Sequence, residues 1–312
     1  RWEAQNTAEN YRLQISETSD FSTIVEDIQN IDGNMKFVSG LKNLHKYYWR
    51  VRAEHSLGDG PWSEVYEFTT TGNPPVLTYP DDGMMDANFG IKFEWQDLYG
   101  EVNYRLQITE TGDFSDPLRD IPAIDTTVRD VSGFVNLKQY HWRVRAENEN
   151  GIGQWSSSFS YTTKGVQPEL VSPANGEDAE NIEPTMVWKS IVGNITYTLQ
   201  IAIDTTFASP LFELTDINDT NFTIPPLDYF TTYYWRVRAE SPDAIGLWSD
   251  IWEFRTTPDI PEIVDNPESR GVCFGSDIDL NVVATGSIMQ YQWQKDGEDI
   301  PGQTEPTLLI DD

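Results

Sequence analysis

One eight-residue sequence occurs three times: YYWRVRAE at residues 47–54, YHWRVRAE at 140–147 and YYWRVRAE at 233–240. The copies are 93 residues apart (142 − 49 = 93 and 235 − 142 = 93 for the tryptophans). Within each copy an apolar set of Tyr, Trp, Val and Ala alternates with a polar set that ends in Arg, Arg and Glu. A period of two is typical of a strand with one face on a core. We therefore expect the same half-buried strand in three successive units.

Further landmarks keep the same spacing, which indicates that whole domains are repeated. The sequence Tyr-x-Leu-Gln-Ile occurs at 11–15, 104–108 and 197–201, and Gly-x-Trp-Ser occurs at 60–63, 153–156 and 246–249. The apolar positions alternate in short segments, and no helical spacing extends over a useful length. About seven short strands per unit predict an all-β protein of tandem immunoglobulin-like β-sandwiches.

Short, polar, proline-bearing segments mark the boundaries, at 71–75, 164–168 and 258–261. Linkers of this kind join domains without a long flexible tether. The predicted domains are residues 1–70, 71–163, 164–257 and 258–312.

The three repeats resemble fibronectin type III domains over residues 1–257. The resemblance lies in a tryptophan on the second strand, a Leu or Phe six residues before a strand-opening tyrosine, and the Tyr-x-Trp-Arg-Val-Arg-Ala strand itself. It implies that the strand-opening tyrosines form tyrosine corners, in which the phenol bonds to backbone upstream. That role is structural, and it falls on Tyr47, Tyr140 and Tyr233.

The Gly-x-Trp-Ser element resembles half of the tryptophan-serine box of cytokine-receptor type III domains, where a tryptophan inserts between strand arginines. The resemblance implies three ladders of Arg over Trp, with cation–π contacts of about 0.5–2 kcal/mol each. A second interpretation makes the aromatics a sugar platform or a partner site, but repetition in every unit favours packing. The residues are Arg50, Arg52 and Trp62; Arg143, Arg145 and Trp155; and Arg236, Arg238 and Trp248.

Residues 258–312 leave the repeat and look like the first half of a bacterial immunoglobulin-like domain, with strand-like segments at 279–286, 291–297 and 307–310. The resemblance makes Trp293 the core tryptophan of this module. In similar modules a cysteine placed like Cys273 pairs with one near the domain's end, so we expect a disulfide to a cysteine beyond Asp312. The alternative is a buried free thiol.

The register also bears on the ends of the sequence. Residue 1 aligns with residue 94, so the first domain is expected to lack its opening strand and most of its second. The last module is expected to lack its closing strands. We expect a window of a longer polypeptide, and the alternative is that another chain supplies the missing strands.

Composition excludes several classes of function. Lys and Arg number 21 against 51 Asp and Glu, a net charge of −30, which disfavours nucleic acid and anionic membranes as partners. The longest apolar runs are a few residues, so no membrane insertion is expected. One Cys and three His leave no multi-cysteine zinc site. No nucleophile elbow, phosphate loop or dinucleotide fingerprint occurs, and we expect no enzyme.

No cofactor is expected, and calcium is the best small-ligand candidate. Carboxylates gather in two corresponding turns near domain junctions, where hard oxygen ligands would suit the ion. The EF-hand spacing is missing, so solvated acidic turns are the favoured interpretation. The residues are Asp81, Asp82 and Asp86, and Glu177, Asp178, Glu180 and Glu183.

The mixture of modules resembles large surface proteins of bacteria that use type IX secretion. It implies a non-enzymatic, extracellular stalk segment of a bacterial cell-surface or secreted adhesin that mediates display and protein or glycan interaction. The implied partners are other domains of a larger parent chain, surface proteins and glycans. One alternative is a set of accessory modules of an extracellular hydrolase whose catalytic domain lies elsewhere, and another is a true glycan-binding module.

Overall fold

A computed structural model of the chain describes residues 1–269, 271–273, 275–286 and 290–310. These residues form strands and turns and no helix, which confirms the all-β class predicted from the alternation. It follows that none of them belongs to a helix long and apolar enough to span a membrane. The chain divides into two compact units, Arg1–Gly165 with Pro242–Ala244, and Val166–Ser241 with Ile245–Asp312.

The first repeat is one antiparallel sheet with the strand order β2-β1-β3-β4. The first copy of the repeated sequence lies in β3, where Val51 stands opposite Leu13 and Trp49 opposite Ile15 of β1. Residues 1–70 are all described and contribute no second sheet. The strands are β1 (Asn10–Ser16), β2 (Ile24–Ile31), β3 (Lys46–Glu54) and β4 (Tyr66–Thr69).

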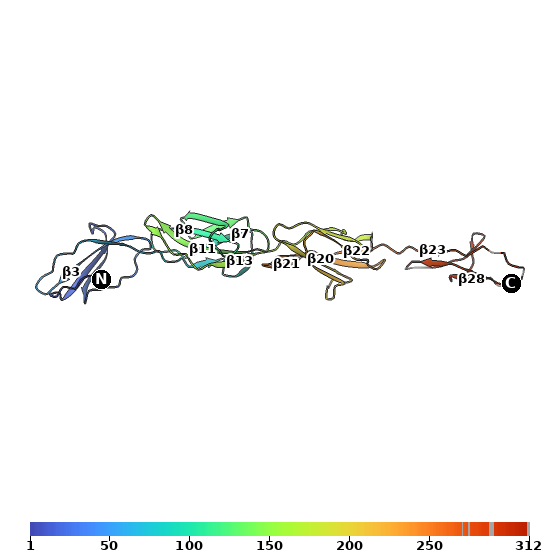
Figure 1. The fold of residues 1–312 in the computed structure, drawn as a ribbon, viewed down its shortest axis with the longest axis horizontal. Coiled ribbons are helices and arrows are strands. Elements are labelled where there is room, and N and C mark those ends of the chain that lie inside the picture. Colours follow the sequence, from blue (N-terminus) through green and yellow to red (C-terminus); the bar gives the residue numbers. More distant parts are fainter. Residues whose placement is uncertain (270, 274, 287–289, 311–312) are drawn as a thin grey trace. The chain divides into compact units, whose positions relative to one another are not determined.

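The second repeat is a two-layer sandwich (Figure 1). One layer has the order β10-β7-β5, and the other has the order β6-β13-β11-β8-β9, with β12 paired to β11. The strands are β5 (Leu77–Tyr79), β6 (Met84–Ala87), β7 (Gly90–Trp95), β8 (Asn103–Thr109), β9 (Arg119–Ile124), β10 (Val128–Ser132), β11 (Gln139–Asn148), β12 (Gly151–Ile152) and β13 (Phe159–Thr163).

The core of this sandwich lies between its layers. Phe93 of β7 meets Trp142 of β11 edge to face, with ring centroids 5.0 Å apart, and both side chains are fully buried. The inward residues of β11 are Tyr140, Trp142, Val144 and Ala146, all at most 1% exposed. Burial of this apolar surface is the main favourable term for the fold. The alternation in the repeated sequence therefore maps directly onto the packed face.

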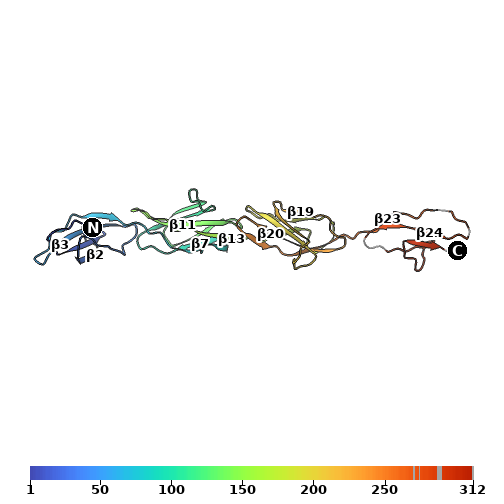
Figure 2. The same ribbon diagram turned by 60° about the horizontal axis from the view of Figure 1, so that its bottom comes forward.

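The third repeat has the same topology in the second compact unit, with layers β14-β16-β19 and β15-β22-β20-β17-β18 and with β21 paired to β20. Figure 2 marks the two layers by β19 and β20. Its strands are β14 (Leu170–Ser172), β15 (Glu177–Glu180), β16 (Thr185–Trp188), β17 (Thr196–Ala202), β18 (Phe212–Ile217), β19 (Asn221–Thr223), β20 (Thr232–Glu240), β21 (Ile245–Trp248) and β22 (Trp252–Thr256).

Residues 258–310 form only two-stranded pairs where they are described: β23 with β25, β24 with β28, and β26 with β27. Short pairs do not enclose a core. The strands are β23 (Glu262–Asp265), β24 (Ile278–Asn281), β25 (Val283–Thr285), β26 (Gln294–Lys295), β27 (Glu298–Asp299) and β28 (Thr307–Ile310).

One expectation for this last segment needs correction, and it concerns the cysteine. Trp293 is half-buried and lines a hollow together with Val282 and Ala284, and its place in a core stays a prediction. Its indole N–H donates to the backbone oxygen of Glu305 at 2.8 Å. Cys273 is exposed, so the buried-thiol alternative is wrong. The expected disulfide partner lies beyond Asp312, outside the described residues, and that pairing stays a prediction.

Candidate functional site

The most regular feature of the surface is a stack of alternating aromatic and arginine side chains on the outward face of β11. The guanidinium carbon of Arg143 lies 4.1 Å from the ring centroid of Phe114 and 4.2 Å from that of Trp155. Arg145, two residues along the strand, lies 4.4 Å from the same tryptophan ring. We call the series Phe114–Arg143–Trp155–Arg145 the ladder of the second repeat.

The first and third repeats contain the same ladder. In the first, Arg50 lies 4.0 Å from the ring centroid of Phe21, and Arg50 and Arg52 lie 4.5 and 5.0 Å from that of Trp62. The third ladder consists of Phe207, Arg236, Trp248 and Arg238, with the corresponding distances 4.2, 4.3 and 4.6 Å. The structure thus brings together every arginine and tryptophan that the sequence predicted for these positions.

A glutamine on the neighbouring strand fixes the first arginine of each ladder. Gln107 Oε1 accepts hydrogen bonds from both Nε and Nη2 of Arg143, at 3.1 and 2.8 Å. Gln14 holds Arg50 in the same way at 3.0 and 2.8 Å, and Gln200 holds Arg236 at 2.9 and 2.8 Å. A two-pronged contact to the planar guanidinium fixes its orientation as well as its position.

The second arginine of each ladder pairs with a carboxylate two residues along its own strand. Arg145 Nε donates to Glu147 Oε1 at 2.7 Å, and Arg238 Nε donates to Glu240 at the same distance. Arg52 Nη2 donates to Glu54 at 3.0 Å. The outward set of Arg, Arg and Glu in the repeated sequence is therefore one connected row of contacts.

Partial burial affects the first arginine of the second and third ladders. Desolvation, followed by repulsion from the second arginine, lowers the pKa of Arg143 and of Arg236 from its ordinary value. An arginine side chain stays charged at neutral pH despite such a shift. The ladder therefore holds two cations within reach of one indole, where the glutamine oxygen and the ring faces contact them and the glutamate balances one of the two charges.

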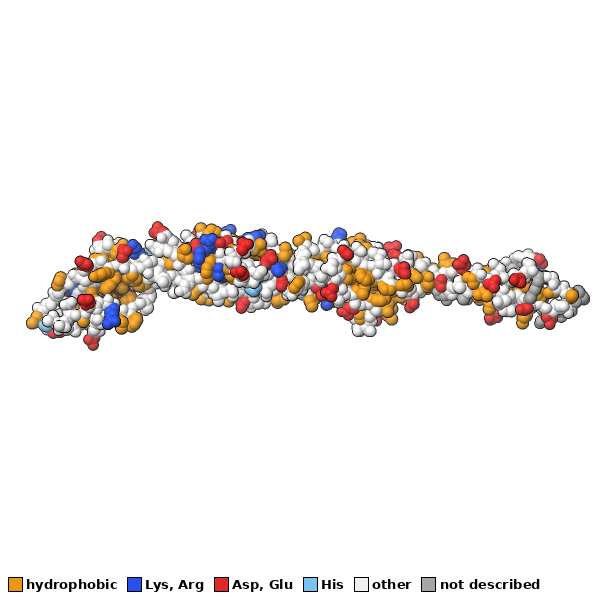
Figure 3. Space-filling model, viewed as in Figure 1, with side chains coloured by type: hydrophobic (Ala, Val, Ile, Leu, Met, Phe, Trp, Pro, Cys, Tyr) orange, Lys and Arg blue, Asp and Glu red, His pale blue; other side chains and the backbone are white. Residues whose placement is uncertain are grey.

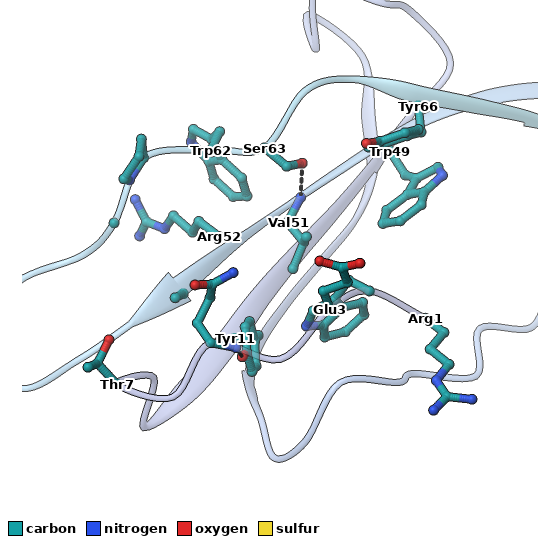
Figure 4. A pocket seen from close by; sticks show the side chains of 15 residues that line it. Arg1, Glu3, Thr7, Tyr11, Trp49, Val51, Arg52, Trp62, Ser63 and Tyr66 are labelled. Carbon is teal, nitrogen blue, oxygen red and sulfur yellow. Dashed lines mark hydrogen bonds between the residues drawn. The ribbon is translucent and has the colours of Figure 1, made fainter.

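The serine of Gly-x-Trp-Ser positions the tryptophan. Ser156 N–H donates to the backbone oxygen of Val144 at 2.8 Å, and Val144 N–H donates to Ser156 Oγ at 3.1 Å. Ser63 and Val51 make the same pair of contacts at 2.9 and 3.1 Å, and Figure 4 shows the bond to Ser63 Oγ. This clamp seats each tryptophan between the two arginines of the adjacent strand.

Sequence reasoning missed the phenylalanine and the glutamine of each ladder. Their signal was present, because both recur with the 93-residue period as Phe21, Phe114 and Phe207 and as Gln14, Gln107 and Gln200. The phenylalanines lie in a loop between strands, where no alternation marks them. The glutamines occupy polar positions of a strand, where solvent exposure is the ordinary expectation.

The strand-opening tyrosines have the geometry of tyrosine corners. The backbone N–H of Lys42 donates to Tyr47 Oη at 3.0 Å, that of Val135 to Tyr140 Oη at 3.1 Å, and that of Asp228 to Tyr233 Oη at 3.1 Å.

A second set of tyrosine contacts was not foreseen. Tyr11, Tyr104 and Tyr197 accept backbone N–H groups six residues upstream at 2.7–2.9 Å. Tyr104 Oη also donates to Asp97 at 2.8 Å, and burial raises the pKa of Tyr104 to about 12.

The first repeat has an open hollow lined by Tyr11, Trp49, Val51 and Tyr66 among others (Figure 4). The equivalent face of the second repeat is covered by the layer β10-β7-β5, and Trp142 there is fully buried while Trp49 is half-buried. The hollow therefore lies where a second layer packs in the complete repeats.

The acidic turns do not converge on a metal site. In the part of the chain that the structure describes, no three His, Cys, Asp or Glu side chains lie close enough together to hold an ion. Asp82 Oδ1 accepts the N–H of Ser160 at 2.8 Å, and Asp178 pairs with Arg255 through two bonds of 2.7 Å. On the face shown in Figure 3, acidic side chains are spread over the surface of each repeat.

Comparison with known proteins points to one kind of domain. No protein-family model matches the chain. The chain is 24% identical over 247 residues to mouse fibronectin type-III domain-containing protein 3A, and the match covers 73% of this chain and 19% of the relative. It is 28% identical over 203 residues to human interleukin-6 receptor subunit beta, and the match covers 60% of this chain and 22% of the relative. The chain thus spans about a fifth of the length of the curated relatives it matches.

Solved structures of tandem fibronectin type III domains are also similar. The FN1–FN3 domains of chicken CNTN1 share 19% identity at a TM-score of 0.29, over 82% of this chain and 92% of that one. A two-domain fibronectin type III segment of chicken tenascin shares 12% identity at a TM-score of 0.45, over 59% of this chain and 99% of the tenascin segment. Together with the observed sandwiches, the sequence similarities support tandem fibronectin type III-like domains, which serve as structural and interaction modules.

Proposed function

We propose that this chain is a non-enzymatic stalk segment of a large bacterial cell-surface or secreted adhesin, displayed outside the cell. The observation that carries the proposal is the same ladder, with the same glutamine and serine contacts, in each of three successive repeats. A recognition site usually concentrates its energy in a few residues at one place. A packing device is useful in every domain of a series, so its regular recurrence supports a spacer.

The ladder ties together three chain segments of each repeat. In the second repeat the phenylalanine comes from the loop after β8, the arginines from β11 and the tryptophan from the segment after β12. Cation–π contacts of about 0.5–2 kcal/mol each supplement the strand pairing of β8 with β11. Domains stiffened in this way and joined in series hold a distal region away from a surface.

The ladders are poor platforms for sugars. A sugar ring stacks on an open aromatic face, but each ladder tryptophan lies within 5.0 Å of two guanidinium groups. We therefore expect glycan or protein partners to bind other domains of a larger parent chain. Titration of the chain with soluble polysaccharides is expected to leave tryptophan fluorescence unchanged.

The location can be tested on the cells that produce the protein. An antibody raised against residues 71–257 is expected to label intact cells or the culture medium, and protease added to intact cells is expected to remove the cell-bound signal. A signal that is released and cleaved only after lysis would place the chain inside the cell and overturn the proposal. A catalytic activity that co-purifies with the parent chain and requires these repeats would instead favour the accessory role in a hydrolase.

A further inference from the structure

A loop of the first repeat inserts into the core of the second, inside one compact unit of the chain. Leu44 lies just before β3 of the first repeat, yet it is 2% exposed and belongs to the core cluster of the second repeat with Leu77 and Ala146. Its backbone is left-handed, with φ at +47°. The equivalent residues Leu137 and Phe230 are left-handed too, so this conformation belongs to the turn itself, and the burial of Leu44 is what marks the contact with the second repeat.

Asn43 supplies the polar part of the same contact. Its backbone N–H and its side-chain Nδ2 both donate to the backbone oxygen of Tyr99, at 2.7 and 3.0 Å. Its Oδ1 accepts the backbone N–H of Asn73 in the linker at 2.9 Å. The side chain is 8% exposed, so these bonds lie largely out of water, where leaving one unmade is costly.

Two side-chain amides of the second repeat donate hydrogen bonds to this loop. Asn148 at the end of β11 donates from Nδ2 to the backbone oxygen of Leu44 at 2.9 Å, and Asn150 donates from Nδ2 to the same oxygen at 3.1 Å. Asn148 Nδ2 also donates to Glu101 O at 2.9 Å. The loop is therefore held from its backbone, its polar side chain and its apolar side chain.

Glycines permit the close approach of the two repeats. A Cβ on Gly72 would lie 2.8 Å from the Cα of Gly153 and 3.0 Å from Leu44 Cγ. A Cβ on Gly100 would lie 2.9 Å from the backbone oxygen of Asn43. Any side chain at Gly72 or Gly100 would have to push the repeats apart.

From these contacts we propose that Asn43 and Leu44 form a lock that makes the first two repeats one rigid body. The lock needs no ligand and does not depend on the proposed stalk function. A flexible joint would need few buried contacts across it and a tolerant linker, and here the linker itself is bonded to Asn43. The pair recurs one period later as Asn136 and Leu137, and Leu137 has the same 2% exposure and left-handed backbone.

The test measures the spread of distances between the two repeats in the full chain. Spin labels are attached to cysteines introduced by Gln29→Cys and Asp130→Cys, both at exposed positions, with Cys273→Ser to remove the native thiol. Pulsed electron paramagnetic resonance is expected to give one narrow distance peak. In the Asn43→Ala, Leu44→Ala variant the width is expected to at least double. Leu137→Ala is the matched control, since it removes an equivalent leucine away from this joint, and its width is expected to match the parent.

Each outcome decides the proposal. A parent distribution as broad as that of the double variant would overturn it, and so would an unchanged narrow peak in a double variant that is folded by circular dichroism. If that variant fails to fold, Asn148→Ala with Asn150→Ala removes only the two amides that donate to Leu44 O, and this pair is expected to broaden the peak. An unchanged peak in that pair would then overturn the lock.

Discussion

Tyr161 is the clearest exception among the buried residues. Its ring is fully buried in the second repeat, stacked on Tyr140, but no partner for its hydroxyl is found in the described part of the chain. The same register holds Phe68 in the first repeat and Phe254 in the third. A buried phenol without a hydrogen bond costs free energy that a phenylalanine does not.

The first prediction follows from that comparison within the chain. We expect Tyr161→Phe to raise the free energy of unfolding of the second repeat by about 1 kcal/mol. We expect Tyr140→Phe to lower it by about the same amount, because Tyr140 Oη accepts the N–H of Val135 at 3.1 Å. Urea titration of each variant measures both changes. Equal losses in the two variants would contradict the assignment of Tyr161 as unpaired.

The second prediction concerns alkaline pH. Burial raises the pKa of Tyr104 to about 12 and also raises that of Tyr161, while an unfolded tyrosine titrates near 10. The folded state therefore binds more protons above pH 10, so this stability is complete below pH 10 and falls as the pH rises toward 12. Unfolding free energy measured from pH 9 to 12 is expected to decline, and less steeply in Tyr161→Phe. A flat profile would be inconsistent with buried neutral phenols.

At the scale of the element, the ladder depends on the shape of its arginines. We expect Arg143→Lys to destabilise the second repeat by about 1–2 kcal/mol, since an ammonium loses the two bonds to Gln107 and the planar stacking on Phe114 and Trp155. Because the substitution keeps the positive charge, any loss of stability measures the contribution of the planar guanidinium geometry. The matched control is Lys92→Arg on β7, whose side chain is half exposed and pairs with Glu94, and its effect is expected to stay within about 0.5 kcal/mol. Equal effects of the two substitutions would show that the ladder has no special role.

Much of this element was predictable from the sequence, and the part that was not has a physical reason. Alternation in YHWRVRAE fixed which side chains of β11 face the core and placed Arg143 and Arg145 outward beside Trp155. Phe114 escaped prediction because it comes from a loop, where direction is set by tertiary contact.

At the scale of the whole molecule, the 93-residue period predicted the repeats because equivalent residues pack in the same way in each of them. The joint between the first two repeats was not predictable in the same way. Asn43 and Leu44 look like an ordinary polar loop in sequence, and only the position of the next repeat makes Leu44 a core residue. Contacts between repeats carry no alternation that a sequence pattern could reveal.

The whole-molecule charge leads to the prediction on metal. With 51 acidic residues, weak calcium contacts are available everywhere, but Asp82 and Asp178 already have protein partners. We expect millimolar calcium or a chelator to change the melting temperature by less than about 2 °C. A specific site, with calcium at a hundred times its Kd, would instead raise the free energy of unfolding by about 2.7 kcal/mol. Magnesium at equal ionic strength is the control. A saturable rise with calcium alone would reinstate the acidic turns as ligands.

If the ladders make the repeats spacers that resist stretching, a single-molecule force experiment on the full chain, held between two handles, tests this most directly. The second and third repeats are expected to unfold in separate steps of about 300 Å, the extended length of about 93 residues less the folded span. Arg143→Lys is expected to lower the unfolding force of one of these steps and leave the other unchanged. A chain that extends without such steps, or a force that Arg143→Lys does not alter, would contradict the claim.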